Sequence, residues 1–468
     1  MYIKQLYTGC LAEAAYYIES NGVAAIVDPL RDVDEYLAIA EERGASIKYI
    51  LETHFHADFV SGHLDLAKRT GAKIVYGPTA QPSFEAYIAE DNEVLPLGKA
   101  RLKVLHTPGH TMESSTFLAI DEEGNHHSIF TGDTLFIGDV GRPDLAVKTD
   151  LSREDLAGHL YNSLHQKIMP LGDELIVYPG HGQGSACGKN MSSETTDTLG
   201  HQKQTNYALN PNLTKEEFIK EITEGLVAPP QYFPKNAVLN KTGYEDLDEI
   251  LERGVTALSV EDFETYAQEE NTLVLDTRHQ SEFMKGHIPN ALYIGLHDNF
   301  APWVGALVKD LKTPLLFIAD EGREEEVVTR LSRVGYDNPL GYLKGGFQAW
   351  LKAEKPIVET PQLKLEQLQA DFQNLQNHIL DVRKKSEYER QHLAGVINKP
   401  LDFMPDNLKD LTDEKPYYLH CAGGYRSVIA ASILERQGLE AYSIEGGFNE
   451  MTKMELPLTE PQEVNNML

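Results

Sequence analysis

The stretch Thr53-His54-Phe55-His56-Ala57-Asp58-Phe59-Val60-Ser61-Gly62-His63 decides how the first half of this sequence is interpreted. It directly follows Ile47-Lys-Tyr-Ile-Leu-Glu-Thr53, an apolar run that predicts a buried strand. Histidine and aspartate side chains gathered at the end of a strand provide the donors that a borderline metal ion binds. We therefore predict a metal site on strand-end loops. Three more such loops follow, each beside a glycine: Thr107-Pro-Gly-His110, Thr131-Gly-Asp133-Thr134 and Pro179-Gly-His181-Gly182.

Strand-like and helical runs alternate around this stretch. Ala24–Asp28 and Ile47–Thr53 have the composition of buried strands. Between them, Asp32–Gly44 has spaced apolar residues, an aspartate at its start and a glycine at its end, which predicts a helix. A proline-containing linker at 229–234 follows, and we predict one large α/β domain over residues 1–245.

The remainder of the chain contains an internal repeat. Leu273–Arg278 recurs as Ile379–Arg383, with the aspartates 105 residues apart, and Leu343-Lys-Gly-Gly-Phe347 recurs as Ile444-Glu-Gly-Gly-Phe448. Each copy has about 100 residues, which suits a small domain. Buried strands that alternate with helices imply parallel βαβ units. We predict two copies of a small α/β domain with parallel sheets, over residues 250–356 and 360–468.

Composition excludes several classes of function. Lys plus Arg number 42 and Asp plus Glu number 72, and the net charge of −30 argues against nucleic-acid and anionic-membrane binding. No apolar run of about 18 residues predicts a transmembrane helix, and the first residues lack the apolar segment of a secretory signal. The three cysteines, Cys10, Cys187 and Cys421, are too few for a disulfide framework. We expect a cytoplasmic protein in a reducing compartment.

The histidines and aspartates of the four loops are His54, His56, Asp58, His110, Asp133 and His181. In order and type they resemble the metallo-β-lactamase fold, in its glyoxalase II and persulfide dioxygenase branch. The resemblance implies a four-layer αββα sandwich with metal at one edge. The family signature usually has a histidine directly after the aspartate, where this chain has Phe59. Because a phenyl ring cannot coordinate a metal, the two-metal site of a zinc hydrolase is disfavoured.

The resemblance implies one Fe(II) per chain, held by His54, His110 and Asp133 as in persulfide dioxygenases. Three ligands on one side of the metal leave open positions for O₂ and a sulfur substrate. Zinc is the expected substitute for iron, and in a zinc enzyme His56 would become a ligand. Otherwise the remaining residues of the set would orient ligands or bound water: His56, Asp58 and His181.

Two further residues are candidates for substrate binding. Gly141-Arg142-Pro143-Asp144 resembles a Gly-Arg-x-Asp segment of the persulfide dioxygenases, and two parallel hydrogen bonds would let Arg142 bind a carboxylate. A structural ion pair with Asp144 is the alternative. Cys187, between glycines, is interpreted either as a residue that holds or relays sulfur or as a buried packing residue. Cys10 is expected to be a packing residue.

The loop Cys421-Ala422-Gly423-Gly424-Tyr425-Arg426-Ser427 lies between a strand-like run and an apolar helix. Its backbone N–H groups, the helix N-terminus and Arg426 favour an anion, so Cys421 is expected to be a thiolate nucleophile. Four residues separate Cys421 from Arg426, where protein tyrosine phosphatases have five. The shorter loop resembles rhodanese sulfurtransferases, with a cysteine phosphatase as the alternative. The predicted catalytic residues are Cys421 and Arg426, and the loop that cradles sulfur is Ala422, Gly423, Gly424 and Tyr425.

The first copy of the repeat lacks this cysteine. Its corresponding segment is Phe317-Ile-Ala-Asp-Glu-Gly-Arg-Glu-Glu-Glu326, and no cysteine occurs between residues 188 and 420. Three consecutive glutamates there would oppose a thiolate. We predict a catalytically inactive rhodanese-like domain with a spacing or interface role.

The resemblance covers the whole chain and implies a sulfide-detoxifying persulfide dioxygenase–sulfurtransferase. A small-molecule thiol persulfide and O₂ would give sulfite, and Cys421 would transfer sulfane sulfur, with thiosulfate as the expected product. The family also implies a homo-oligomer. Two alternatives stay open: a zinc thioester hydrolase similar to glyoxalase II fused to a sulfurtransferase, and a sulfurtransferase whose large domain only binds a partner.

Overall fold

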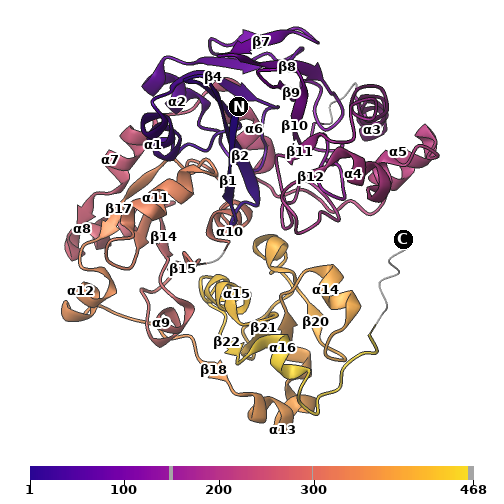
Figure 1. Ribbon diagram of the computed structural model, residues 1–468. Coiled ribbons are helices and arrows are strands. Elements are labelled where there is room, and N and C mark those ends of the chain that lie inside the picture. The colour runs from indigo at the N-terminus through magenta and orange to yellow at the C-terminus, as the bar shows by residue number, and fades with distance from the viewer. Residues whose placement is uncertain (147–150, 298, 462–468) are drawn as a thin grey trace. The chain divides into compact units, whose positions relative to one another are not determined.

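Figure 1 shows the computed structural model, which describes residues 1–146, 151–297 and 299–461. Among these residues, every helix is too short or too polar to cross a bilayer. The chain divides into two compact units. The first comprises Met1–Glu249 and Thr329–Asp337, and the second comprises Ile250–Val328 and Asn338–Leu468.

Two six-stranded mixed sheets form the centre of the first unit. The first sheet has the order β1-β2-β3-β4-β5-β6: Tyr2–Thr8, Glu13–Ser20, Val23–Val27, Ser46–Glu52, Lys73–Tyr76 and Tyr87–Ile88. The second has the order β12-β11-β10-β9-β8-β7, and its strands β7 to β12 are Val94–Leu97, Ala100–His106, Ser115–Ile120, His126–Gly132, Ile176–Pro179 and Asp197–Thr198. The predicted strands at 24–28 and 47–53 are β3 and β4.

Three apolar cores separate four layers in this unit. Successive residues of a strand face opposite sides of a sheet, so β2 contributes to two cores. Tyr16 packs against Phe130 between the two sheets, whereas Tyr17 packs with Leu66 beneath the helices of the first sheet. Leu160 of α3 covers the outer face of the second sheet. This αββα arrangement confirms the predicted sandwich. The helices are α1 to α7: Asp34–Arg43, His63–Thr70, Arg153–Ser163, Leu199–Thr205, Lys215–Thr223, Phe233–Thr242 and Leu247–Gly254.

Residues 329–337 complete the first unit around a buried arginine. The side chain of Arg31 has no exposed surface, and its Nη1 donates to Asp337 Oδ1 at 2.7 Å and to the Ser332 carbonyl at 3.2 Å. Its Nε also lies 3.5 Å from Asp65 Oδ2. The Val60 amide, which belongs to the predicted metal loop, donates to the Arg333 carbonyl at 2.8 Å. This short segment therefore supports both the core and the loop of the first unit.

The second unit contains two five-stranded parallel sheets with the same strand order, shifted by five strands. The predicted repeat and its parallel sheets are confirmed. One sheet is β13-β17-β16-β14-β15, with β13 to β17 at Ala257–Leu258, Leu273–Asp276, Leu292–Tyr293, Leu315–Ile318 and Pro339–Leu343. The other is β18-β22-β21-β19-β20, with β18 to β22 at Gln362–Leu363, Ile379–Asp381, Ile397–Asn398, Tyr417–His420 and Ala441–Ile444.

Nine α-helices of the described residues accompany these two sheets. Those of the first copy are α8 to α12: Val260–Ala267, Gln280–Lys285, Phe300–Leu307, Glu324–Ser332 and Gly346–Lys352. Those of the second copy are α13 to α16: Leu365–Leu375, Lys385–Arg390, Tyr425–Glu435 and Gly447–Met451.

Candidate metal centre and cysteine loop

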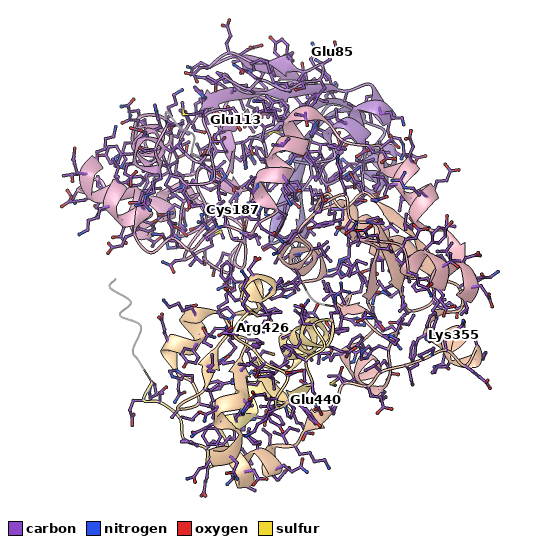
Figure 2. All side chains as sticks on the ribbon, turned by 180° about the vertical axis from the view of Figure 1, so that it is seen from behind. Glu85, Glu113, Cys187, Lys355, Arg426 and Glu440 are labelled. Carbon is purple, nitrogen blue, oxygen red and sulfur yellow. The ribbon has the colours of Figure 1, made fainter. Side chains whose placement is uncertain are left out.

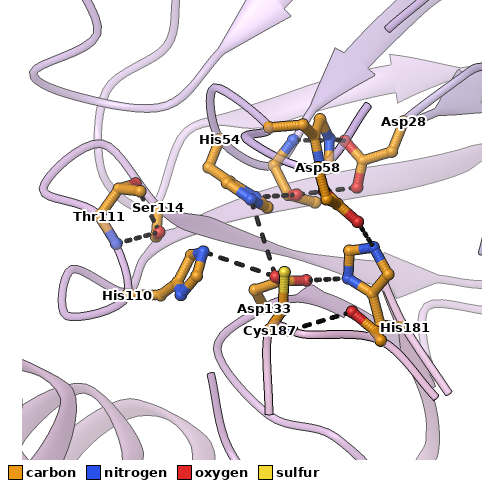
Figure 3. A network of polar contacts seen from close by, with 12 residues as sticks. Asp28, His54, Asp58, His110, Thr111, Ser114, Asp133, His181 and Cys187 are labelled. Atoms are coloured by element: carbon orange, nitrogen blue, oxygen red, sulfur yellow. Dashed lines mark hydrogen bonds and ion pairs between the residues drawn. The ribbon is translucent and has the colours of Figure 1, made fainter. Parts of the chain in front are cut away.

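Three predicted metal ligands from three separate loops lie together in the first unit (Figure 3). His54 follows β4, His110 lies between β8 and β9, and Asp133 follows β10. His54 Nε2 is 3.9 Å and His110 Nε2 is 3.5 Å from Asp133 Oδ2, and all three side chains are buried. A Cβ on Gly132 would lie 2.4 Å from Thr53 Oγ1, so only glycine lets β10 approach β4 this closely. The loops that sequence analysis selected thus meet at one point.

The donor atoms of this cluster fit a metal ion. Asp133 Oδ2 is buried and has no hydrogen-bond partner among the described residues. The His110 Nδ1–H donates to the Arg142 carbonyl at 2.9 Å, and His54 Nδ1 lies 3.0 Å from Thr53 Oγ1, which itself donates to Asp28 Oδ2 at 2.8 Å. These contacts fix the tautomer of each ring and direct both Nε2 lone pairs toward Asp133. Two imidazoles and one carboxylate suit Fe(II) or Zn(II).

The charge states of these groups also favour metal binding. Burial, together with the neighbouring His56, lowers the pKa of His54 well below its ordinary value, so the ring is neutral. Burial alone would raise the pKa of Asp133, but the rings of His181, His110 and His54 together outweigh burial and hold that pKa well below its usual range. A neutral imidazole and an ionised carboxylate are the forms that coordinate a metal.

His181, which follows β11, bridges two carboxylates. Its Nδ1 lies 2.8 Å from Asp133 Oδ1 and its Nε2 lies 2.7 Å from Asp58 Oδ2. Burial opposes a charge on this ring, but the two carboxylates raise the pKa of His181 well above its ordinary value. The thiol of Cys187 belongs to the same cluster, with donor atoms of Asp58, His181 and Cys187 within 4.8 Å of one another. Burial and the nearby Asp58 raise the pKa of Cys187 well above its ordinary value, so it is a neutral thiol.

His56 lies in a different buried cluster. Its Nε2 is 3.1 Å from Asp28 Oδ1 and 3.7 Å from Glu52 Oε2, and its ring packs on Phe59 with centroids 4.3 Å apart. His63 Nδ1 lies 3.8 Å from Glu52 Oε1 on the other side of this carboxylate. Sequence analysis did not select Asp28 or Glu52. The available signal was an acidic residue at the end of each of two buried strands.

Asn240 of α6 is a second residue that sequence analysis missed. Its side-chain amide donates to the His56 and Phe59 carbonyls, both at 2.7 Å, and its carbonyl oxygen accepts the Ser61 amide at 2.9 Å. The loop at residues 56–61 is therefore hydrogen-bonded to a helix that is distant in sequence. No local sequence pattern predicts such a contact.

The guanidinium of Arg142 has structural partners in this protein. Its Nε and Nη2 donate to the two carboxylate oxygens of Asp144, both at 2.7 Å, and its Nη1 donates to the Ala186 carbonyl at 3.3 Å. Of the two interpretations of Arg142, substrate binding and a structural ion pair with Asp144, these contacts agree with the ion pair. Its backbone carbonyl, in contrast, orients the His110 ring.

The predicted persulfide loop connects β21 to α15 in the second unit, where Figure 2 labels Arg426. The Gly424 amide donates to Cys421 Sγ at 3.1 Å, and the Cys421 thiol contacts Ser427 Oγ at 3.9 Å. Arg426 forms two hydrogen bonds with the carboxylate of Glu387, at 2.6 and 2.9 Å. The loop therefore presents a backbone donor to the sulfur, while its arginine is held by a neighbouring helix.

The repeated Gly-Gly-Phe sequence that ends at Phe448 holds the Cys421 loop in place. The Phe448 amide donates to the Cys421 carbonyl at 2.7 Å, and the Asn449 amide donates to the Ala422 carbonyl at 3.1 Å. Gly447 has φ 64°, and a Cβ there would lie 2.6 Å from the Ala422 oxygen. The Gly-Gly-Phe sequence thus allows the backbone at residues 447–449 to approach and hydrogen-bond the backbone at residues 421–422.

Comparison with known proteins agrees with both units. The metallo-beta-lactamase superfamily profile matches residues 8–181, and the rhodanese-like domain profile matches residues 259–353 and 364–454. Cytoplasmic hydroxyacylglutathione hydrolase of Arabidopsis thaliana is 33% identical over 184 residues, 38% of this chain and 67% of that protein. Mitochondrial persulfide dioxygenase ETHE1 of Homo sapiens is 30% identical over 201 residues, 42% of this chain and 70% of that protein.

A solved structure is similar over a longer part of the chain. The metallo-beta-lactamase from Staphylococcus aureus subsp. aureus COL is 32% identical with a TM-score of 0.63, and the match covers 74% of this chain and 98% of that one. The two curated relatives, in contrast, are matched over about two thirds of their own length. They have different activities at similar identity, one a hydrolase and the other a dioxygenase.

Proposed function

Since the chain belongs to the metallo-β-lactamase superfamily and also has two rhodanese-like domains, we propose that it couples an iron-dependent persulfide dioxygenase to a sulfurtransferase. The observation that supports this most directly is the cluster of His54, His110 and Asp133, whose donor atoms lie within 4.8 Å of one another. Three donors from one side suit the two-histidine, one-carboxylate iron site of oxygenases.

One neighbour of this cluster has no donor atom for a metal, and another directs one of its two ring nitrogens toward carboxylates. Phe59 has no donor atom, and the Nε2 of His56 faces Asp28 and Glu52. Fe(II) bound by the three donors would bring O₂ and a substrate sulfur together and supply the redox chemistry. The net reaction converts a thiol persulfide, O₂ and water into the thiol and sulfite.

The second unit provides the sulfur-transfer step of the proposal. A sulfane sulfur on Cys421 would lie at the backbone donor of Gly424, which already donates to Sγ. Attack by sulfite on the outer sulfur forms thiosulfate, breaks the S–S bond and leaves the thiolate on Cys421. The small backbone loop suits sulfur better than a phosphate ester.

Oxygen uptake with glutathione persulfide, measured beside the iron content of anaerobically purified full-length protein, tests the dioxygenase. We expect uptake with sulfite as product, and His110→Ala should remove bound iron and oxygen uptake together. Asp133→Ala should do the same. Iron-loaded protein that consumes no oxygen with this substrate would contradict the proposal.

A second candidate is a zinc thioester hydrolase similar to glyoxalase II. Two observations favour it: the relative named hydroxyacylglutathione hydrolase, and the donor group of Asp58, His181 and Cys187 beside Asp133. Two zinc ions per chain, together with hydrolysis of a hydroxyacylglutathione without oxygen uptake, would establish it in place of the dioxygenase.

A further inference from the structure

The guanidinium of Arg426, beside the Cys421 loop, is occupied by a carboxylate of the same copy. Its Nη1 donates to Glu387 Oε2 at 2.6 Å, and its Nη2 donates to Glu387 Oε1 at 2.9 Å. Only 17% of the Arg426 side chain is exposed. Arginine binds the oxygens of other oxyanions through the same two parallel hydrogen bonds. Glu387 therefore fills the positions at which Arg426 would bind an anionic substrate.

A second carboxylate acts on the same guanidinium. Asp402 belongs to the 3₁₀ helix Leu401–Asp406, which packs against α15, the helix on which Arg426 lies. Burial would lower the pKa of Arg426, but its bonds to Glu387 and the charge of Asp402 contribute to raising it above its ordinary value. Two carboxylates thus oppose one guanidinium, and a further anion beside it is disfavoured.

The sulfur of Cys421, in contrast, is held by the backbone. The Gly424 amide donates to Sγ at 3.1 Å. A Cβ on Gly423 or on Gly424 would have no atom of the described residues within 4 Å, apart from the adjoining residues, so the loop is open to a substrate here. Backbone N–H groups of such a loop bind a small anionic atom. The loop can thus hold a transferred sulfur without the charge of Arg426.

The first copy shows that the repeat alone does not impose this pairing. Glu282 takes the place of Glu387, but it pairs with Lys285 at 2.7 Å on the surface. Counting from the paired strands of each copy puts Glu324 at the position of Arg426. A glutamate at this place therefore holds an arginine in the copy that has the cysteine.

We propose that Glu387 is a positioning residue that determines which acceptor takes sulfur from Cys421. By holding Arg426, it lowers the affinity of the loop for sulfite and leaves uncharged thiols unaffected. The inference rests on the proposed sulfur transfer through Cys421. In each transfer the acceptor attacks the outer sulfur, the S–S bond breaks and the electron pair stays on Sγ as the thiolate. Sulfite becomes thiosulfate, whereas dithiothreitol becomes a persulfide, which closes to the cyclic disulfide and releases sulfide.

Full-length protein with sulfane sulfur on Cys421 separates acceptor binding from transfer. It is loaded with glutathione persulfide in the absence of oxygen, freed of the donor, and mixed with increasing concentrations of sulfite or of dithiothreitol. Peptide mass spectrometry follows the loss of sulfur from Cys421. In Glu387→Gln the half-saturating concentration of sulfite should fall about fivefold, the size of one half-exposed charge interaction, with an unchanged maximal rate. The rates with dithiothreitol should stay those of the wild type.

Three further variants show whether Glu387 acts through Arg426. Glu282→Gln is the matched control, because Glu282 takes the same place in the first copy, and it should change the rates with neither acceptor. In protein that carries Arg426→Gln, adding Glu387→Gln should change the sulfite dependence less than it does in the wild type. Asp402→Asn leaves the pair of Glu387 and Arg426 intact and should lower the half-saturating concentration of sulfite by a smaller factor.

Each contrary result has one meaning. An unchanged sulfite dependence in Glu387→Gln would overturn the inference and leave sulfur transfer through Cys421 intact. Equal changes with sulfite and dithiothreitol, or an equal effect of Glu387→Gln without Arg426, would also reject it. Wild-type protein whose Cys421 takes up no sulfur, or passes it to neither acceptor, would overturn the proposed sulfurtransferase itself. If Glu387→Gln does not fold, an unchanged sulfite dependence in Asp402→Asn would reject the inference.

Discussion

The two rhodanese-like copies share a buried framework but differ in the loop where Cys421 lies. In the first copy, Arg278 pairs with Asp276 at 2.5 Å and its guanidinium lies 4.1 Å from the Phe347 ring. In the second, Arg383 pairs with Asp381 at 2.6 Å, and the corresponding distance to the Phe448 ring is 3.7 Å. This aspartate–arginine–phenylalanine cluster explains why the repeat is visible in the sequence.

The residues that follow β16 in the first copy and β21 in the second make different polar contacts. The pairing of β14 with β16 and of β19 with β21 places Ala319 at the position of Cys421. In the first copy Arg323 pairs with Glu326 in the first turn of α11, whereas in the second the Gly424 amide donates to the cysteine sulfur. The two copies therefore differ in a few residues after these strands, while the aspartate–arginine–phenylalanine cluster is common to both.

The largest expected effect comes from the cysteine that the first copy lacks. Cys421→Ser should lower thiosulfate formation about 10⁴-fold or more, the size expected when a nucleophile is removed. Oxygen uptake with glutathione persulfide should remain, because the proposed dioxygenase site belongs to the first unit. Ala319→Ser is the matched control and should leave both activities unchanged. Undiminished thiosulfate formation in Cys421→Ser would refute sulfur transfer through this residue.

Because both copies contain the aspartate–arginine–phenylalanine cluster, removing its arginine should reduce stability equally in the two copies. Arg278→Met and Arg383→Met each remove the partner of a buried aspartate, and should destabilise the second unit by about 3 kcal/mol, as for other broken buried pairs. Urea unfolding followed by circular dichroism measures this loss. A loss confined to Arg383→Met would show that the first copy does not depend on the cluster.

A smaller effect is expected where the first copy contacts the loop and helix that follow Cys421. The Tyr425 hydroxyl donates to the Gly295 carbonyl at 3.0 Å, and the Tyr293 amide nearby donates to Ser432 Oγ at 3.1 Å. Tyr425→Phe should cost about 1 kcal/mol in unfolding free energy, the value of one hydrogen bond. Thiosulfate formation should also slow in this variant. An unchanged rate and an unchanged free energy of unfolding would show that the hydrogen bond has no role.

The smallest effect concerns pH. Burial alone would raise the pKa of Glu387, but its bonds to Arg426 outweigh burial and lower it below 4.5, its ordinary value. A lowered folded pKa means that the pair stabilises the protein above pH 4.5, and that this contribution is lost as the pH falls through the folded pKa.

Glu387→Gln should therefore reduce the free energy of unfolding at pH 7 by up to about 1 kcal/mol and have no effect in acid. In the first copy Glu282 takes the same place but pairs with Lys285 at the surface. Glu282→Gln should thus change less at pH 7. Unfolding curves at pH 7 and in acid compare the two, and equal losses at both pH values would contradict the pairing.

Much of the fold and the set of histidines and aspartates on strand-end loops followed from local sequence patterns, whereas the choice of three donors among them came from the family resemblance. His54, His110 and Asp133 each follow a strand and lie next to a glycine or in a dense histidine motif. The environment of His56 did not follow, because the direction of a side chain depends on which buried groups face it. The contacts of Asn240 and of Arg31 with Asp337 were equally unpredictable, because they join residues about 180 and 306 positions apart.

The segment at 329–337 has a practical consequence for preparing the first unit alone. A fragment that ended at residue 245 would lose Asp337, so the charge of Arg31 would face Asp65 without its main counterion. It would also lose the Arg333 carbonyl that receives the Val60 amide. Such a fragment would be expected to precipitate or to bind metal poorly for reasons unrelated to its ligands.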